Sequence, residues 1–226
     1  MDLPVWQQLY SELKDNNFVV LAVAMDSREG AELPWIEAAK PEYPCLIDRE
    51  HRLADIYNMV NVPQAIWIDE QGRVVRPVET AGSYEGFRAM DRSKGTMPED
   101  VAKVTADAKK TYIAAVRDWV LKGPQSEHAF DEQHARAHVE APDSKRAEAH
   151  VLFRLGQALL KRGRADDAEK VFARARDLHP DSWNIWRQTY PPNDRGLAAG
   201  PEFWARVDAL GKRRYYAPVD MKGMPG

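Results

Sequence analysis

The 226-residue sequence contains a single cysteine, Cys45, so it cannot form an internal disulfide. It also lacks any apolar run of 18 residues, which excludes a membrane-spanning helix. Its 32 Lys and Arg residues against 35 Asp and Glu residues leave a net charge of −3, and only the short stretch "GKRRYY" is strongly basic. We therefore expect no nucleic-acid partner and no anionic-membrane partner. No basic segment followed by an apolar one opens the sequence, so these residues include no signal peptide.

Residues 1–90 alternate helix and strand patterns, which predicts an α/β layered domain. Apolar side chains three and four positions apart predict a helix over residues 3–13, with Pro4 in its first turn. The apolar run at 18–25, "FVVLAVAM", is typical of a strand buried on both faces. A short strand is predicted at 43–48, between helices at 31–40 and 50–60. Residues 62–80 predict a β-hairpin that turns at Glu70-Gln71-Gly72.

Residues 97–215 are predicted to form a helical domain, followed by an extended tail at 216–226. A long helix is expected to begin near Thr96 as its cap, with Pro98 in the first turn, and to end at Gly123. A shorter polar helix is expected within residues 127–140. The stretch 82–98 contains Gly and Ser residues, and we place the domain boundary there.

Residues 149–182, "AHVLFRLGQALLKRGRADDAEKVFARARDLHPDS", resemble one tetratricopeptide repeat. Small Gly156 and Ala168 would let its two helices approach closely, while Leu155 and Phe172 would fill the space between them. Gly163 falls at the turn and Pro180 closes the unit. One repeat cannot bury its own face, so we expect flanking helices at 127–140 and 182–190 to cover it.

The first part resembles the thioredoxin-like fold in its TlpA/ResA (redoxin) branch of thiol–disulfide oxidoreductases. The segment "LPVWQQLYSELKDNNFVVLAVAMD" is similar to that family's first helix and next strand, and residues 43–75 are similar to its stretch leading through "VP" into the hairpin. The resemblance implies that Val62 and Pro63 form a substrate-binding segment, with the Val62 backbone pairing with an extended substrate. It also implies that Pro63 follows a cis peptide bond.

The family's Cys-x-x-Cys motif, counted back from Pro4, would fall just upstream of Met1, as would the central strand that carries it. The resemblance therefore implies an N-terminally truncated thioredoxin-like domain without its redox nucleophile, inactive as it stands. A misassigned start or a fragment is the favoured explanation. The sharper alternative is a selenocysteine, encoded by a stop codon, in the upstream part. Exposed strand edges would favour self-association.

Other chemically capable residues have ordinary structural explanations. Cys45 lies at a strand position and is interpreted as a buried structural thiol. His134 and His138 have the i, i+4 spacing of a metal pair, but they lie with His128 in a charged segment that shows no third ligand, so we interpret them as surface histidines. Asp26, Asp48 and Asp69 each follow an apolar strand, where a carboxylate most often caps a helix or turn. We expect no metal and no other cofactor.

Two functions remain open from the sequence. The resemblance implies a thiol–disulfide oxidoreductase or peroxidase-like enzyme that acts on a protein thiol, disulfide or peptide partner. The alternative is a non-catalytic thioredoxin-like and tetratricopeptide scaffold for protein–protein interaction. Relatives usually work outside the cytoplasm, but no feature of these residues assigns a compartment.

Overall fold

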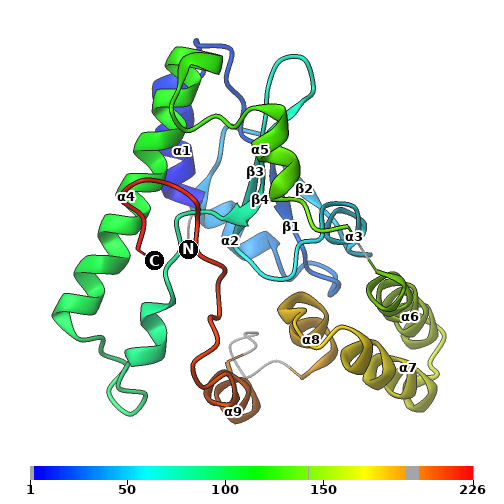
Figure 1. Ribbon diagram of the computed structural model, residues 1–226. Helices are drawn as coiled ribbons and strands as arrows, with labels where there is room; N and C mark the ends of the chain where they lie inside the picture. Colours follow the sequence, from blue (N-terminus) through cyan, green and yellow to red (C-terminus); the bar gives the residue numbers. More distant parts are fainter. Residues whose placement is uncertain (1–2, 142, 192–198, 226) are drawn as a thin grey trace. The chain divides into compact units, whose positions relative to one another are not determined.

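The computed structural model describes residues 3–141, 143–191 and 199–225 (Figure 1). The chain divides into two units that interleave along the sequence. The first unit comprises Met1–Glu12, Val19–Val62 and Glu140–Gly200, and the second comprises Leu13–Phe18, Pro63–Val139 and Pro201–Gly226. Each unit thus contains residues from both sides of stretch 82–98, and the domain boundary placed there stays a prediction.

The first unit holds a parallel strand pair and most of the helices. Its elements are α1 (Leu3–Leu13, whose last residue falls in the second unit), β1 (Ala22–Ala24), α2 (Leu33–Ala39), β2 (Cys45–Ile47), α3 (Arg52–Tyr57), α6 (Ser144–Lys161), α7 (Ala165–Leu178) and α8 (Trp183–Thr189). β1 and β2 pair from Ala22 opposite Cys45 to Ala24 opposite Ile47. The predicted helix over residues 3–13 is confirmed.

The apolar run at 18–25 differs from its prediction. Only Ala22–Ala24 form a strand, and the side chains of Val19 and Leu21 are 57% and 60% exposed. Among the described residues, β1 pairs with β2 alone. A strand is buried on both faces only within a larger parallel sheet that helices cover on both sides. The two-stranded pair of β1 and β2 does not provide such burial for this apolar run.

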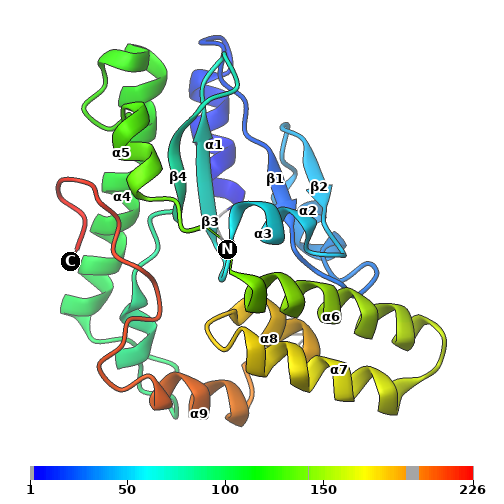
Figure 2. The same ribbon diagram turned by 45° about the vertical axis from the view of Figure 1, so that its right-hand side comes forward.

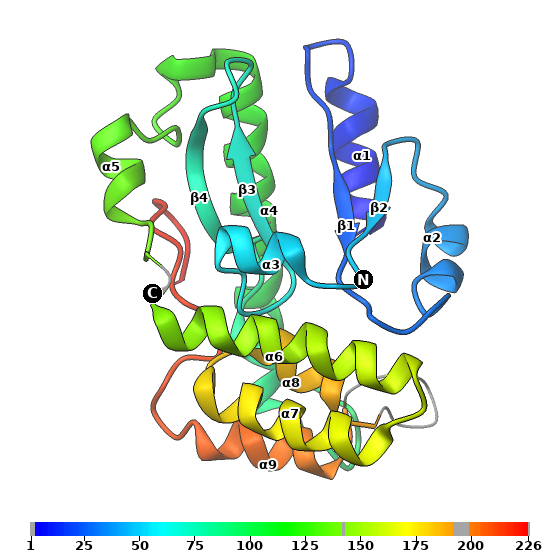
Figure 3. The ribbon, with the colours of Figure 1, turned by 90° about the vertical axis from the view of Figure 1, so that its right-hand side faces the viewer.

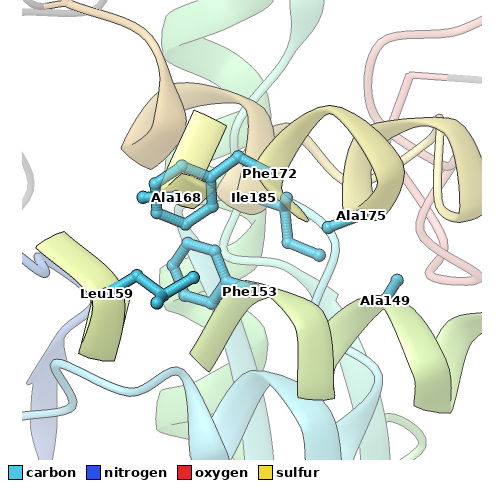
Figure 4. Close-up of a cluster of buried hydrophobic side chains, with 7 residues drawn as sticks. All are labelled: Ala149, Phe153, Leu159, Ala168, Phe172, Ala175 and Ile185. Atoms are coloured by element: carbon cyan, nitrogen blue, oxygen red, sulfur yellow. The ribbon is translucent and has the colours of Figure 1, made fainter. Parts of the chain in front are cut away.

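α6 and α7 form an antiparallel pair in the first unit (Figure 2). Their cluster of buried side chains, drawn in Figure 4, consists of Ala149, Phe153, Leu159, Ala168, Phe172, Ala175 and Ile185. The Phe153 and Phe172 rings lie 6.0 Å apart between the two helices. A Cβ atom at position 156 would clash with the Phe172 ring, so the close approach expected at this glycine is confirmed.

The helix that covers this pair is α8, one of the two candidates. Ser182 caps it by accepting a hydrogen bond from the Ile185 N–H at 3.2 Å, and Ile185 enters the buried cluster. The other candidate, the segment at 127–140, belongs to the second unit. Leu155, expected between the helices, is instead 43% exposed, because Phe153 and Phe172 already occupy the space there.

α6 also packs against the α/β part of the first unit. Gln157 donates to the backbone oxygen of Arg49 at 2.7 Å, and Arg154 pairs with Asp55 of α3 at 2.9 Å. Phe153 contacts the ring of His51, with centroids 4.7 Å apart. His51 is fully buried, and this burial lowers its pKa to about 4. A buried imidazole is held in its neutral form, since charging it without water is costly.

The second unit is built on the predicted hairpin, which is confirmed. Its elements are β3 (Gln64–Ile68), β4 (Val74–Thr80), the 3-10 helix η1 (Glu85–Ala89), α4 (Glu99–Lys122), the 3-10 helix η2 (Gly123–Gln125), α5 (Glu132–Ala137) and α9 (Pro201–Ala209). β3 and β4 are antiparallel, and Gly72 in the turn has a φ of 77°, which glycine adopts without strain. The hairpin packs on α4 through Trp67, whose indole N–H donates to the Tyr112 hydroxyl at 2.9 Å.

A buried arginine joins the hairpin to later parts of the second unit. Arg76 is 1% exposed and forms an ion pair with Glu79 at 2.7 Å. Its guanidinium also donates to the backbone oxygens of His128 and Asp220, each at 2.9 Å. Each of its three nitrogens donates at least one hydrogen bond, which offsets the cost of burying this charge.

Two helix starts in the second unit differ from prediction. α4 begins at Glu99 after Pro98, and no side chain caps it. Thr96 instead bridges to Asp91, whose N–H donates to the Thr96 backbone oxygen at 2.8 Å. The polar helix expected at 127–140 is limited to Glu132–Ala137, because Asp131 caps it by accepting from the His134 N–H.

We predict that Gly156→Ala destabilises the first unit. The added methyl group meets the Phe172 ring, and overpacking of about 1–3 kcal/mol outweighs the gain of about 1 kcal/mol in helix propensity. Urea unfolding should show the loss, and Phe172→Leu in the same chain should recover part of it. Gly163→Asn is the control, since its turn is open and asparagine tolerates a positive φ. Equal stability of Gly156→Ala and wild type would contradict the close packing.

We also predict acid destabilisation from His51. The pKa of His51 is about 4 in the folded protein, below its usual value of 6.5, so between these values only the unfolded chain binds a proton there. The folded protein therefore keeps its full stability above pH 6.5 and loses part of it as the pH falls toward 4. This difference corresponds to about 3 kcal/mol in the free energy of unfolding. Unfolding measured across this range should show a shallower decline for His51→Asn. His128→Asn is the matched histidine control, and an unchanged slope in His51→Asn would refute the assignment.

Candidate functional site

The segment that precedes the hairpin, residues 59–63, contains the two site residues expected from the sequence. The Val62 side chain is 39% exposed, and its N–H donates to Asn61 Oδ1 at 2.9 Å. The Pro63 backbone oxygen accepts from the Ala81 N–H at 3.3 Å, which continues the hairpin by one interaction. Val62 ends its part of the first unit, and Pro63 starts a part of the second.

The start of α8 holds the residues that lead into Val62. The Val60 backbone oxygen accepts from the N–H groups of Trp183 at 2.7 Å and Asn184 at 3.2 Å. The Asn184 side chain, itself buried, donates to the Met59 backbone oxygen at 2.8 Å. These contacts use the free N–H groups of a helix start to fix an irregular segment.

Arg187 of α8 completes this attachment. Its guanidinium donates at 2.9 Å to the same Asn61 Oδ1 that accepts the Val62 N–H. Asn61 is buried, so its amide links the helix directly to the backbone of the expected substrate segment. The sequence offered no signal for Asn184 and Arg187, because their partners lie more than 120 residues away.

Cys45 lies in β2, opposite Ala22. Burial raises the pKa of its thiol, so at neutral pH it is protonated and not an activated nucleophile. It is the only thiol in the sequence. Nothing in its surroundings activates this thiol.

The three strand-end aspartates act as caps, as predicted. Asp48 accepts from the N–H groups of Arg52 and Leu53 at the start of α3, at 3.0 and 2.6 Å. Asp69 accepts from the Gln71 and Arg73 N–H groups and so closes the hairpin turn. Asp26 accepts from the Arg28 N–H at 3.1 Å.

The structure brings two of the expected histidines together with a residue that the sequence did not indicate. Nε2 of His134 and Nε2 of His138 lie 3.0 and 3.1 Å from Oδ2 of Asp220. The hydrogen bond from His134 is the main cause that lowers the Asp220 pKa. His128 lies outside this cluster, and its backbone oxygen accepts a hydrogen bond from Arg76.

With this geometry in place, the comparisons with known proteins separate two parts of the chain. Residues 2–76 match the sequence model of the AhpC/TSA family, and residues 149–189 match a tetratricopeptide repeat model. The chain combines a redoxin-like segment with a tetratricopeptide repeat. No curated protein and no solved structure gave a significant match. Along the described residues, no helix is both long enough and apolar enough to cross a membrane.

The two matched parts meet within the first unit. α6, α7 and α8 belong to the repeat match, while α3 and residues 59–62 belong to the redoxin match. Figure 3 shows α3 beside α6, and the Arg154–Asp55 ion pair joins these two helices. The repeat thus contacts the redoxin-like segment at α3 and, through α8, at residues 59–61.

We predict that Asn184→Ala loosens residues 59–63. It leaves the Met59 carbonyl without its side-chain donor, which costs about 1–3 kcal/mol for a buried group. Amide hydrogen exchange should become faster at Val60 and Val62. Thr189→Ala is the matched control on α8, because its hydroxyl bonds only to carbonyls of its own helix. Unchanged exchange in Asn184→Ala would show that α8 does not hold the segment.

Proposed function

We propose that the chain is part of a TlpA/ResA-like thiol–disulfide oxidoreductase whose redox nucleophile lies outside residues 1–226. The observation that carries this proposal is that the described strands form two separate pairs. Among the described residues, β1 pairs only with β2 and β3 pairs only with β4. In the thioredoxin fold, the strands that correspond to β1 and β3 flank one central strand, which delivers the redox motif. The match of residues 2–76 to the AhpC/TSA family supports the same assignment.

The proposed chemistry is thiol–disulfide exchange. A thiolate, or a selenolate, at a helix start attacks one sulfur of a substrate disulfide and forms a mixed disulfide, while the other sulfur leaves as a thiolate. The positive end of the helix lowers the pKa of the attacking group. A second thiol would then release the substrate and leave the enzyme oxidised.

In this proposal Val62 and Pro63 receive the substrate chain. A partner protein or peptide would pair in an extended conformation with the backbone at Val62. Because the Val62 N–H already donates to Asn61 Oδ1, substrate pairing through that N–H must displace the Asn61 side chain. α8 and Arg187 hold Asn61, so the repeat would tune how readily the segment accepts a partner.

A second candidate function is a non-catalytic scaffold for protein–protein interaction. It is favoured by the exposed apolar side chains of α6, where Val151 is 56% and Leu160 is 50% exposed. Tetratricopeptide helices commonly present such faces to a neighbouring repeat or a peptide. The scaffold requires no nucleophile, so the two candidates differ in whether the native protein contains a redox-active cysteine or selenocysteine.

The first test is the intact mass of the native protein from its own cells, with its N-terminal peptides sequenced. We expect a species heavier than the 25.7 kDa of residues 1–226, with a cysteine or selenocysteine in the added part. A mass that matches residues 1–226 would contradict the oxidoreductase and leave the scaffold.

Activity measurements complete this test. Residues 1–226 should not reduce insulin disulfides or peroxide above the level of a Cys45→Ser chain. In the native protein, Pro63→Ala should lower kcat/KM by about 10–100-fold, since small misplacement of a substrate is that costly. Pro41→Ala, in a loop of the first unit, is the control. Equal kcat/KM for Pro63→Ala and wild type would remove residues 62–63 from the substrate site.

A further inference from the structure

The second unit contains a cluster of two imidazoles and one carboxylate. His134 lies on α5, His138 directly follows that helix, and Asp220 comes from the chain after α9. One ligand atom from each of the three lies within 4.8 Å of the other two. Figure 3 shows the C-terminal segment passing beside the end of α5. The spacing of the two histidines, one helical turn apart, places both imidazoles on the same side.

A hydrogen bond orients the His138 ring so that its second nitrogen faces Asp220. Its Nδ1 lies 3.0 Å from the His134 backbone oxygen, which only accepts, so Nδ1 must carry a proton. Nε2 is then the nitrogen that can bind a metal ion, and it lies 3.1 Å from Asp220 Oδ2.

The buried Arg76 contacts both Asp220 and the aromatic ring that packs on the two histidines. Its guanidinium lies 4.1 Å from the centre of the Phe130 ring and donates to the Asp220 backbone oxygen at 2.9 Å. Phe130 in turn stacks on His134, with centroids 4.1 Å apart, and lies 4.7 Å from the His138 ring. Arg76 and Phe130 together therefore contact all three residues, as outer contacts do in metal sites.

We propose that His134, His138 and Asp220 bind a divalent transition-metal ion, with Zn²⁺ as the representative ion. Tetrahedral Zn²⁺ with bonds near 2.0–2.2 Å places its ligand atoms about 3.3 Å apart, close to the two distances from Nε2 to Oδ2. Imidazole ligands favour Zn²⁺, Fe²⁺ or Cu²⁺ over Mg²⁺ and Ca²⁺. This site is independent of the proposed redox function.

Three protein ligands leave at least one coordination position for water or another molecule. His134 and Asp220 also line a cleft of about 970 Å³ in the second unit, together with Arg73, Arg76 and Glu132. The charged lining is mixed, with four cations and six carboxylates: Arg73, Arg76, Arg136 and Lys222 against Asp69, Glu70, Glu127, Asp131, Glu132 and Asp220.

The test is a titration of residues 1–226, free of any histidine tag, with ZnCl₂ and with CoCl₂. We expect one equivalent of metal, and Co²⁺ absorption bands without a thiolate charge-transfer band. Asp220→Asn, His134→Gln and His138→Gln should each weaken binding at least about tenfold, since even outer-shell changes cost 10–100-fold. His128→Gln and Cys45→Ser are matched controls and should bind as wild type.

Failure of wild type to bind Zn²⁺ at micromolar concentration would overturn the site, and so would unchanged affinity in Asp220→Asn. Circular dichroism checks that each variant is folded. Where a variant fails to fold, electron paramagnetic resonance of Cu²⁺ bound to wild type decides instead. Coupling to two imidazole nitrogens supports the proposal, and coupling to none or one refutes it.

Discussion

Both sheets in the described part of the chain have only two strands, and this constraint governs the rest of the structure. A two-stranded sheet is barely stable in water by itself, so each must be covered by helices. In the first unit, α6 packs on the segment that follows β2, through Phe153 on His51 and the ion pair of Arg154 with Asp55 of α3. In the second unit, α4 covers the hairpin through Trp67 and Tyr112, where burial raises the Tyr112 pKa well above its usual value.

Arg76 has a comparable role in the second unit. A buried guanidinium is stable only when its N–H groups find acceptors, and these come from β4, from the loop before α5 and from the C-terminal segment. The same residue therefore joins three segments that are far apart in the sequence. It also lies behind His134, His138 and Asp220, so the geometry of the proposed metal ligands depends on the integrity of the core.

Most of the redoxin-like segment, residues 2–12 and 19–62, lies in the same unit as the tetratricopeptide repeat, so the repeat can support it directly. α8 bonds to the backbone at Met59 and Val60, directly before the segment expected to receive substrate. An oxidoreductase would gain a partner-responsive support for its substrate segment, while a scaffold would gain a rigid platform. The proposed oxidoreductase and the proposed scaffold would use the same contacts. They would differ in whether the native protein contains a redox nucleophile.

Local pattern in the sequence was enough to predict the first helix, the hairpin with its turn at Gly72, the carboxylate caps and the repeat with its close contact at Gly156. Each depends on neighbours within about 20 residues, where spacing and side-chain size decide the outcome. Apolar composition alone misjudged residues 18–25, since burial of a strand depends on its neighbours in the sheet. The attachment of Asn61 to Arg187 and the meeting of His138 with Asp220 join residues 126 and 82 positions apart. Only the tertiary structure could decide these contacts, because no local physical rule couples side chains at such separations.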